Sequence, residues 1–471
     1  MKQPSLKKNF VLNTIYQILI IVIPFISMPY ISRVLGAGGV GTYSYTYSIQ
    51  TYFAMFAALG TVTYGTREIA RVRENEEERS RLFWEIELLT VLTSLACLIL
   101  WGIWILFNHE YRMCYVILTI NIIAVIFDIS WFYAGMEQFE YIVRQNTIFK
   151  VLGLISLFVF VKHESDLYLY IAIMAASTLL GNMTMWLYLG RFLKKVNVKE
   201  FNLKRHFKET LIYFVPTIAT SIYSVLDKTL IGAITKDANE NGYYEQATNI
   251  VNAAKVVSFV AINGVMESRS SFLFAQGKTD RVKSMIEDSM NYILFMGFGL
   301  IFGLVGAADE FVPWFFGPGF YKVPVLIKML SPVIVIIGVS HCLGSQYYTP
   351  SGRRAQSAKF IITGSVINLV LNLILIPKFW SYGAVIASVI AECVITFLYM
   401  RNCDGYLRLS QLVKIGWKKL LAGIIMAVVL IIIHINMFIE IIIGITLYII
   451  CLVILRDSSI SQGIRMLKNK G

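Results

Sequence analysis

The sequence predicts an all-α integral membrane protein with about 14 transmembrane helices. Of its 471 residues, 57% are hydrophobic and only 15% are charged, and the mean hydropathy is +0.65. Soluble domains are less apolar and carry more charge. Apolar runs of about 20 residues, the length that crosses a bilayer, recur along the whole chain. Basic residues collect in alternate connections between these runs, a pattern that is typical of multispanning proteins.

The apolar runs give the expected spans in order. They cover residues 10–31, 39–64, 83–107, 113–135, 143–161, 167–189, 211–234, 246–266, 291–308, 325–347, 359–377, 382–400, 420–434 and 437–455. The first run is too long for a signal peptide and no A-x-A cleavage site follows it, so we interpret it as a span. The thirteenth run is short for a span.

The placement of basic residues predicts that both termini are cytoplasmic. With an inside N-terminus, the even-numbered loops and the two tails hold about 32 of the 42 Lys and Arg residues, and the odd-numbered loops hold about seven. The net charge of +13 is then explained by inside loops, where basic side chains meet anionic headgroups. We therefore expect membrane lipids as partners and no nucleic acid.

Two stretches six spans apart resemble each other and indicate a duplicated unit. SRVLGAGGVGTY at residues 32–43 and DKTLIGAITKDANENGYY at residues 227–244 both run from a basic residue to a glycine and end in a Gly-containing segment with tyrosine. Repeats offset by six spans share one orientation and favour a binding site between them. We predict a six-helix lobe of residues 1–200, a second six-helix lobe of residues 201–403, and an appended helix pair with a cytoplasmic tail at residues 404–471.

The sequence gives no support for an enzyme. It lacks the G-x-x-x-x-G-K-[ST] motif that binds ATP, and its five histidines have no metal-ligand partner at i+3 or i+4. A membrane glycosyltransferase or polymerase would need a large catalytic loop, whereas the predicted outer loops are short. We expect no catalytic residue, no metal site and no cofactor.

Polar stripes that include a lysine run along the seventh and eighth spans. The stripes consist of Thr217, Ser221, Ser224 and Lys228 in the seventh span and of Thr248, Asn252 and Lys255 in the eighth. Spacings of three and four place such residues on one helix face. A lysine at the centre of a span costs roughly 2.5 to 3.5 kcal/mol, so it should face a wet cavity or a partner. Lysines in this position favour an anionic substrate.

The first lobe supplies a second set of candidates for the same cavity. The basic members are Arg33, Arg144 and Lys150, and the polar members are Asn13, Gln17, Tyr47 and Gln50. Structural alternatives remain open for both sets. Lys228 lies near the outer end of its span and can extend toward the interface, hydroxyl stripes can join helices by hydrogen bonds, and tyrosines are common in interfacial belts.

Three carboxylates in the spans are candidates for ion coupling. Asp128 and Glu392 are single acids in the fourth and twelfth spans, and Asp227 precedes Lys228 in the seventh. Adjacent residues on a helix point about 100° apart, which disfavours a direct pair between Asp227 and Lys228. An alternative is that all three serve as structural partners of the basic residues.

Several blocks of the sequence, in this order, carry a family resemblance. They are SRVLGAGGVGTYSYTYSI, DISWFYAGMEQFEY, VPTIATSIYSVLDKTLIG, NENGYYEQA and INLVLNLILIPKFWSYGAVIASVIAE. From residue 6 to about residue 399 the chain resembles the polysaccharide transporter family, the Wzx-type oligosaccharide flippases of the MOP superfamily. The resemblance implies two pseudo-symmetric lobes of the MOP or MATE type that work by alternating access around a basic cavity.

The resemblance also implies a substrate and a setting. It implies transfer of an undecaprenyl-pyrophosphate-linked oligosaccharide from the cytoplasmic to the outer leaflet of a bacterial cell membrane, for capsule, O-antigen or exopolysaccharide synthesis. A polysaccharide polymerase and the chain-length machinery would be its protein partners. Two alternatives stay open, namely a lipid II flippase and a MATE-type multidrug or cation antiporter. Span one carries no carboxylate, which disfavours the antiporter.

Overall fold

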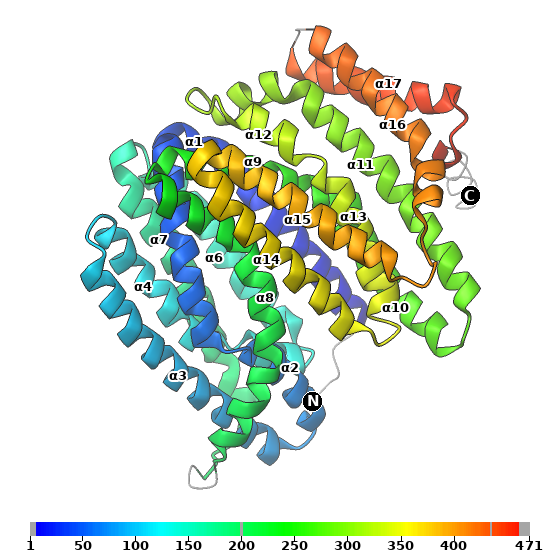
Figure 1. The fold of residues 1–471 in the computed structure, drawn as a ribbon. Helices are drawn as coiled ribbons and strands as arrows, with labels where there is room; N and C mark the ends of the chain where they lie inside the picture. Colours follow the sequence, from blue (N-terminus) through cyan, green and yellow to red (C-terminus); the bar gives the residue numbers. More distant parts are fainter. Residues whose placement is uncertain (1–5, 198–200, 434–435, 461–471) are drawn as a thin grey trace. The chain divides into compact units, whose positions relative to one another are not determined.

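The computed structural model describes residues 6–197, 201–433 and 436–460, and these residues confirm the predicted all-α membrane fold (Figure 1). Within these ranges, eleven helical segments are long and apolar enough to cross a membrane, and they match predicted spans three to six and eight to fourteen. Span one and most of span two fall in α1 (Leu6–Ala58), and span seven falls in α8 (Leu203–Thr235).

The chain forms two compact units. Unit one comprises residues 1–232 and 237–242, and unit two comprises residues 233–236 and 243–471. Most of α8 therefore belongs to the compact body of unit one. The division into six-helix lobes at residue 200 stays a prediction.

Unit one consists of helices that run mostly antiparallel to their sequence neighbours (Figure 1). Besides α1 and α8 they are α2 (Thr61–Val72), α3 (Glu76–Phe107), α4 (Arg112–Ile126), α5 (Ser130–Gly135), α6 (Phe139–Phe160), the short η1 (Glu164–Asp166), α7 (Leu167–Met185) and η2 (Trp186–Arg191). The start of α3 shows why a helix begins where it does. The Asn75 side chain accepts hydrogen bonds from the backbone N–H groups of Glu77 and Glu78, which satisfies two donors of the first turn.

Helix α1 contains a break at Gly36, which separates predicted spans one and two. Gly36 has φ 64° and ψ −178°, a backbone conformation that glycine adopts without a Cβ clash. The Gly-bearing connection expected at residues 32–43 is therefore a single non-helical residue between two helical segments.

The start of α8 is fastened to unit one by a buried hydrogen-bonded chain. The Tyr64 hydroxyl lies 2.7 Å from Nδ1 of His206, and Nε2 of His206 lies 2.8 Å from Oε2 of Glu85. The other oxygen of Glu85 accepts a hydrogen bond from the backbone N–H of Asn202 at 2.8 Å. Because the side chains of Tyr64, His206 and Glu85 are buried and each has a partner, the chain fixes α8 against α2 and α3.

Unit one also contains a close contact between the middle of α1 and the start of α9 (Ala238–Lys255). A Cβ added to Gly41 would lie 1.6 Å from the backbone oxygen of Ala238, and one added to Gly242 would lie 2.1 Å from the backbone oxygen of Ala37. Only glycine allows the two backbones to approach so closely. The Gly-containing segments noticed in the sequence are thus packing sites.

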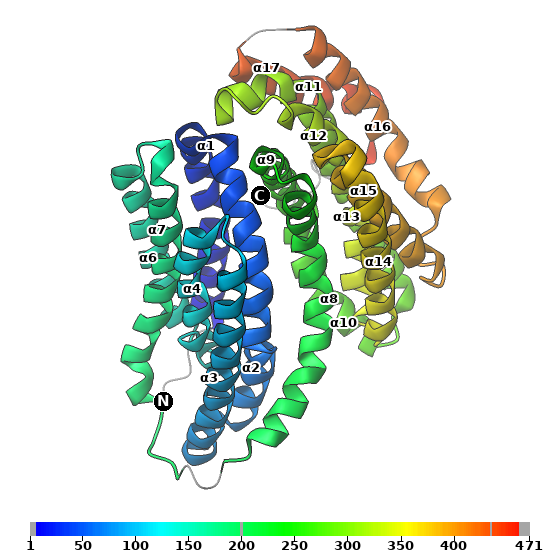
Figure 2. The same ribbon diagram turned by 60° about the vertical axis from the view of Figure 1, so that its left-hand side comes forward.

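Unit two contains the remaining helices, and Figures 1 and 2 both show α16 and α17 beside α11. After α9 they are η4 (Val256–Val260), α10 (Ala261–Ala275), α11 (Thr279–Phe316), α12 (Val323–Leu330), α13 (Val333–Leu343), η5 (Gly344–Tyr348), α14 (Arg354–Phe379), α15 (Ser381–Arg401), α16 (Leu409–Ile432) and α17 (Met437–Ile454). Two of these segments, η4 and η5, are π-helical turns.

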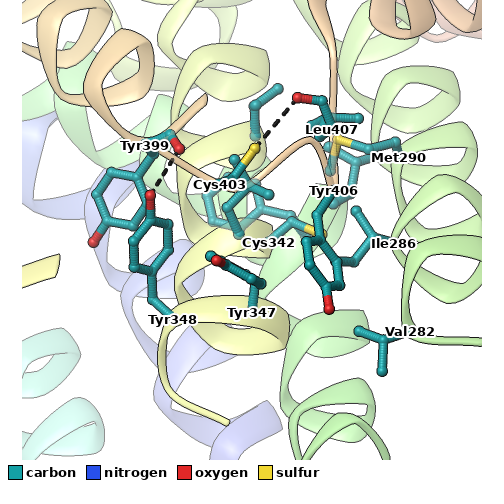
Figure 3. Close-up of a cluster of buried hydrophobic side chains, with 14 of the residues drawn as sticks. Val282, Ile286, Met290, Cys342, Tyr347, Tyr348, Tyr399, Cys403, Tyr406 and Leu407 are labelled. Carbon is teal, nitrogen blue, oxygen red and sulfur yellow. Dashed lines mark hydrogen bonds between the residues drawn. The ribbon is translucent and has the colours of Figure 1, made fainter. Parts of the chain in front are cut away.

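An aromatic core joins α11, η5, α15 and the loop that follows α15 (Figure 3). The Tyr348 hydroxyl donates a hydrogen bond to the backbone oxygen of Tyr399 at 2.9 Å. At the edge of this core, Arg353 contacts Asp404 at 2.7 Å and the Tyr347 hydroxyl donates to Asp404 at 2.8 Å. The Arg353 guanidinium, with help from Tyr347, holds the pKa of Asp404 below its usual value.

The thirteenth span is longer than predicted. Helix α16 runs from Leu409 to Ile432, because Lys419, which shortened the apolar run in the sequence, is fully buried and paired with Asp457 at 2.9 Å. Lys419 also donates a hydrogen bond to the backbone oxygen of Ile415 at 2.8 Å. The expectation of a short span was therefore wrong because the partner of this lysine lies 38 residues away.

Replacing Gly41 should destabilise the protein. We expect Gly41→Ala to cost about 1–3 kcal/mol and to lower the thermal unfolding temperature in detergent, because the methyl group would clash with the Ala238 carbonyl. Gly102→Ala in α3 is the matched control, since nothing lies within 4 Å of its added Cβ and alanine favours a helix. Equal unfolding temperatures for the two variants would contradict the close contact.

Candidate functional site

Lys255 lies at the junction between α9 and the π-helical turn η4. Its ammonium group donates a hydrogen bond to Oδ1 of Asn252 at 3.1 Å, so these two members of the predicted stripe share a helix face. Within the described residues this is the hydrogen bond that Lys255 makes, and its acceptor is neutral. Glu392 of α15, which is 9% exposed, acts on Lys255 electrostatically. The cation is thus held beside an amide and within range of an acid.

The same half of unit two contains a buried network of neutral polar groups. Nε2 of Gln346 donates to Oδ1 of Asn263 at 2.9 Å and to Oγ of Ser289 at 3.0 Å, and Nδ2 of Asn263 lies 3.0 Å from Nδ1 of His341. Gln346 and Asn263 are fully buried. This network was not predicted from the sequence, although single amide residues within apolar runs indicate such contacts.

Two π-helical turns border these polar groups. Turn η4 directly follows Lys255, and turn η5 contains Gln346. A π-turn widens the helix by one residue and is frequent at functional positions. Lys255 and Gln346 therefore lie beside and within the two π-helical turns that the described part of unit two contains.

Unit one has a cavity of 330 Å³ lined by polar and apolar residues of α1, α4 and α7. Two predicted residues, Tyr47 and Gln50, line it. Tyr43, Thr51, Asn121 and Thr178 also line it. Tyr47 is 42% exposed and Gln50 is 2% exposed, so the wall offers both an open aromatic face and a buried amide. Such a wall can form hydrogen bonds with hydroxyl groups and stack against a sugar ring.

The basic residues predicted for unit one occupy α1 and α6. Arg33 is exposed on α1, just before the break at Gly36. Arg144 is exposed near the start of α6, and its guanidinium lies 5.0 Å from the centre of the Tyr188 ring. Lys150 is half-buried further along α6. Their role in substrate binding stays a prediction.

Asp227 and Lys228 both lie in the part of α8 that belongs to unit one. Asp227 is 6% exposed and acts electrostatically on Tyr52 of α1. Two residues further along α8, the Thr229 hydroxyl lies 3.2 Å from the Tyr52 hydroxyl and 2.9 Å from the Ser48 hydroxyl, both of α1. Lys228 is half-buried, and its backbone oxygen accepts a hydrogen bond from Asn241 at 3.0 Å. The charge pair in this apolar run thus lies in a polar contact zone with α1.

Of the remaining predicted polar residues, the structure describes the side chain of Thr248. The Thr248 hydroxyl donates to the backbone oxygens of Tyr244 and Glu245 in its own helix. The side chains of the other members lie outside the described residues, and these members are Asn13, Gln17, Thr217, Ser221 and Ser224.

Glu87, a buried acid that was not predicted as a site residue, is in electrostatic range of Asp128. Asp128 accepts a hydrogen bond from the backbone N–H of Ser130 at 3.0 Å, where α5 begins. Glu87 of α3 is 2% exposed, and among the described residues neither of its carboxylate oxygens has a hydrogen-bond partner. Asp128 is the charged group that acts on Glu87 electrostatically. The buried acid Glu87 therefore lies within electrostatic range of a second acid.

The described residues contain no group of three or more His, Cys, Asp or Glu side chains that could hold a metal ion. The polar sites of both units consist instead of amides, hydroxyls, aromatic rings and separate charges. Their chemistry suits reversible binding of a polar or anionic molecule.

Comparisons with known proteins agree with this description. The chain is 22% identical over 409 residues to the "Putative O-antigen transporter" of Escherichia coli (strain K12), an alignment that covers 84% of this chain and 97% of the relative. It is 27% identical over 264 residues to the "Probable low-salt glycan biosynthesis flippase" of Haloferax volcanii, which covers 54% of this chain and 53% of the relative.

Among solved structures, the lipid II flippase MurJ in an inward closed conformation has a similar fold. The TM-score is 0.77 at 15% identity, over 94% of this chain and 98% of MurJ. A MATE family multidrug transporter of the MOP superfamily in its outward-facing conformation gives a TM-score of 0.50 at 13% identity, over 90% and 93% of the two chains. A family model described as "Polysaccharide biosynthesis protein" matches residues 6–266. The chain belongs to this family of polysaccharide biosynthesis proteins.

Proposed function

We propose that this protein is a flippase that moves undecaprenyl-pyrophosphate-linked oligosaccharide units from the cytoplasmic to the outer leaflet of a bacterial cell membrane. Family membership and the names of the relatives in Escherichia coli and Haloferax volcanii support this class of substrate. The fold shared with a lipid flippase supports the transport of a molecule whose lipid tail stays in the bilayer.

The observation that carries the proposal is the state of Lys255. A lysine kept within a span for structure alone would be neutralised by a carboxylate at salt-bridge distance. The ammonium of Lys255 instead contacts the neutral amide of Asn252, which leaves it two further donors. A pyrophosphate cannot enter hydrocarbon with its charge unmet, and a cation with spare donors can bind it.

The cavity of unit one supports binding of the glycan. A sugar presents hydroxyl groups and one apolar ring face, and the wall formed by Tyr47, Gln50 and Asn121 offers partners for both. Neutral groups suit this task, because a flippase must release its cargo and charge pairs would hold it more tightly.

We further propose alternating access between lobes of residues 1–200 and 201–403, with both termini in the cytoplasm and residues 404–471 as an appended pair and tail. The basic residues Arg33, Arg144, Lys150 and Lys228 would attract the pyrophosphate along the path. A polysaccharide polymerase and chain-length proteins would receive the product at the outer leaflet.

Lipid II is the second candidate substrate, and the MurJ fold is the observation that favours it. Lipid II shares the polyprenyl pyrophosphate, so Lys255 would serve either lipid equally. Cation extrusion fits less well, because a cation site within a membrane would be centred on carboxylates. The site proposed here is centred on Lys255 instead.

Purified protein in liposomes should transfer a lipid-linked glycan between leaflets. We expect a fluorescent undecaprenyl-pyrophosphate oligosaccharide placed in one leaflet to become accessible to an added lectin or glycosidase on the other side, faster than in empty vesicles. A panel that includes O-antigen-type units and lipid II identifies the preferred substrate. Transfer of no panel member above the empty-vesicle rate would reject the flippase proposal, and transfer of lipid II alone would replace its substrate.

Removing the charge of Lys255 should slow this transfer while the protein still folds. We expect Lys255→Ala to reduce the rate at least about tenfold, because a hydrogen bond to a charged group contributes roughly 1.5–3 kcal/mol. Lys255→Arg should retain part of the activity. We expect a smaller loss for Lys228→Ala.

The matched control is Lys359→Ala, which removes an exposed lysine from α14 of the same unit. Membrane levels and thermal unfolding of all variants check that folding is intact. Full transfer by Lys255→Ala would remove this lysine from the proposed path.

A further inference from the structure

A second polar site lies in unit two, where α11, α16 and the end of α17 meet. It is a cavity of 620 Å³. Its polar lining consists of Glu287, Gln411, Lys414, Lys418, Arg456, Asp457 and Ser458, and apolar side chains of α16, of α17 and of Ile460 complete the wall. None of these residues takes part in the path proposed for the glycan.

One lining residue, Asp457, belongs to a buried ion pair. Lys419 and Asp457 contact each other at 2.9 Å, and their side chains are 0% and 3% exposed. Asp457 also accepts a hydrogen bond from the backbone N–H of Ser459 at 2.9 Å. Because Lys419 compensates its charge, Asp457 does not offset the basic residues at the rim.

The rim carries an excess of positive charge. Lys414, Lys418 and Arg456 face one uncompensated acid, Glu287, whose Oε1 already accepts a hydrogen bond from Gln411 at 2.7 Å. Lys418 donates to the backbone oxygen of Arg456 at 3.1 Å, which holds the two basic residues together. Lys414 and Arg456 are exposed, and no side-chain partner is recorded for either among the described residues. Their donors are available to an anion.

The backbone at Arg456 is unusual for an arginine. Its φ is 49°, a left-handed conformation that glycine commonly adopts after the last turn of a helix. The backbone N–H groups of Arg456 and Asp457 bond to the oxygens of Val453 and Leu452 and close the end of α17. An arginine is strained here where glycine would not be.

The surface next to the cavity is apolar. Val413 and Trp417 on α16 are 60% and 47% exposed, and Val453 and Ile454 on α17 are 53% and 73% exposed. In the predicted orientation this is the cytoplasmic end of both spans, where hydrocarbon gives way to headgroups. A ligand of this site would therefore place a negative group in the cavity and acyl chains along the adjoining helices.

We propose that this cavity binds the phosphate headgroup of an anionic phospholipid of the inner leaflet. Phosphate oxygens would accept hydrogen bonds from Lys414, Lys418 and Arg456, and the acyl chains would cover the apolar faces of α16 and α17. The site would tie the appended helix pair to the charge of the membrane, whichever glycan the protein carries.

The test measures lipid binding to the purified full-length protein in detergent by native mass spectrometry. We expect phosphatidylglycerol to bind at least tenfold more tightly than phosphatidylcholine, and K414Q/R456G to lose most of this preference. The matched control K204Q/K208Q removes two exposed basic residues at the start of α8 and should retain it. Without lipid, R456G should unfold at no lower temperature than the wild type, because glycine relieves the backbone strain.

Each other outcome would overturn the proposal. Equal preference in the wild type and in K414Q/R456G would remove the site. Inorganic phosphate that displaces phosphatidylglycerol completely at equal concentration would show a free-anion site, and tenfold tighter binding of undecaprenyl phosphate would assign the cavity to polyprenyl lipids. If the double variant fails to fold, K414Q alone decides, since the Lys414 side chain is exposed.

Discussion

A polar group inside a bilayer must find its partner within the protein, because hydrocarbon offers no water to bind it. This constraint explains the contacts that position the helices. The chain from Tyr64 through His206 to Glu85 fixes α8, and the pair of Lys419 and Asp457 fixes α16. In both cases residues far apart in the sequence satisfy each other, so the requirement for partners selects one arrangement of the helices within each unit.

The same constraint separates a lysine whose charge is fully paired from the lysine that we propose for substrate binding. Lys419 and Lys255 are both lysines in predominantly apolar helices, but Lys419 is fully enclosed by a carboxylate and a backbone oxygen, whereas Lys255 contacts a neutral amide beside a π-turn. The first arrangement is closed and has no capacity for a ligand. The second keeps donors for an anion, and the π-turn gives the helix a local departure from α geometry that a moving transporter can use.

Hydropathy was sufficient to predict the helical membrane fold and the approximate positions of spans three to six and eight to fourteen, because it depends on local composition. Hydropathy and the distribution of basic residues are both local properties. They were not sufficient for contacts that join distant residues. The length of α16 was wrong because the partner of Lys419 is Asp457, and the acids Glu85 and Glu87 escaped notice because they follow a charged connection. Of the candidate site, the pairing of Asn252 with Lys255 follows from helical spacing, whereas the amide network and the full wall around Tyr47 and Gln50 require tertiary structure.

Glu87 of α3 is an acidic residue within a span, as Lys255 is a basic one. Almost every buried polar group in a native protein has a partner, whereas neither carboxylate oxygen of Glu87 has a hydrogen-bond partner among the described residues. The neighbouring Asp128 adds repulsion and makes an unmet negative charge on Glu87 more costly. That cost falls when the group takes up a proton, a cation, or a donor that another conformation brings near. Such groups favour a change of conformation in a transporter, because a conformation in which every polar atom already has a partner is not destabilised relative to the next one.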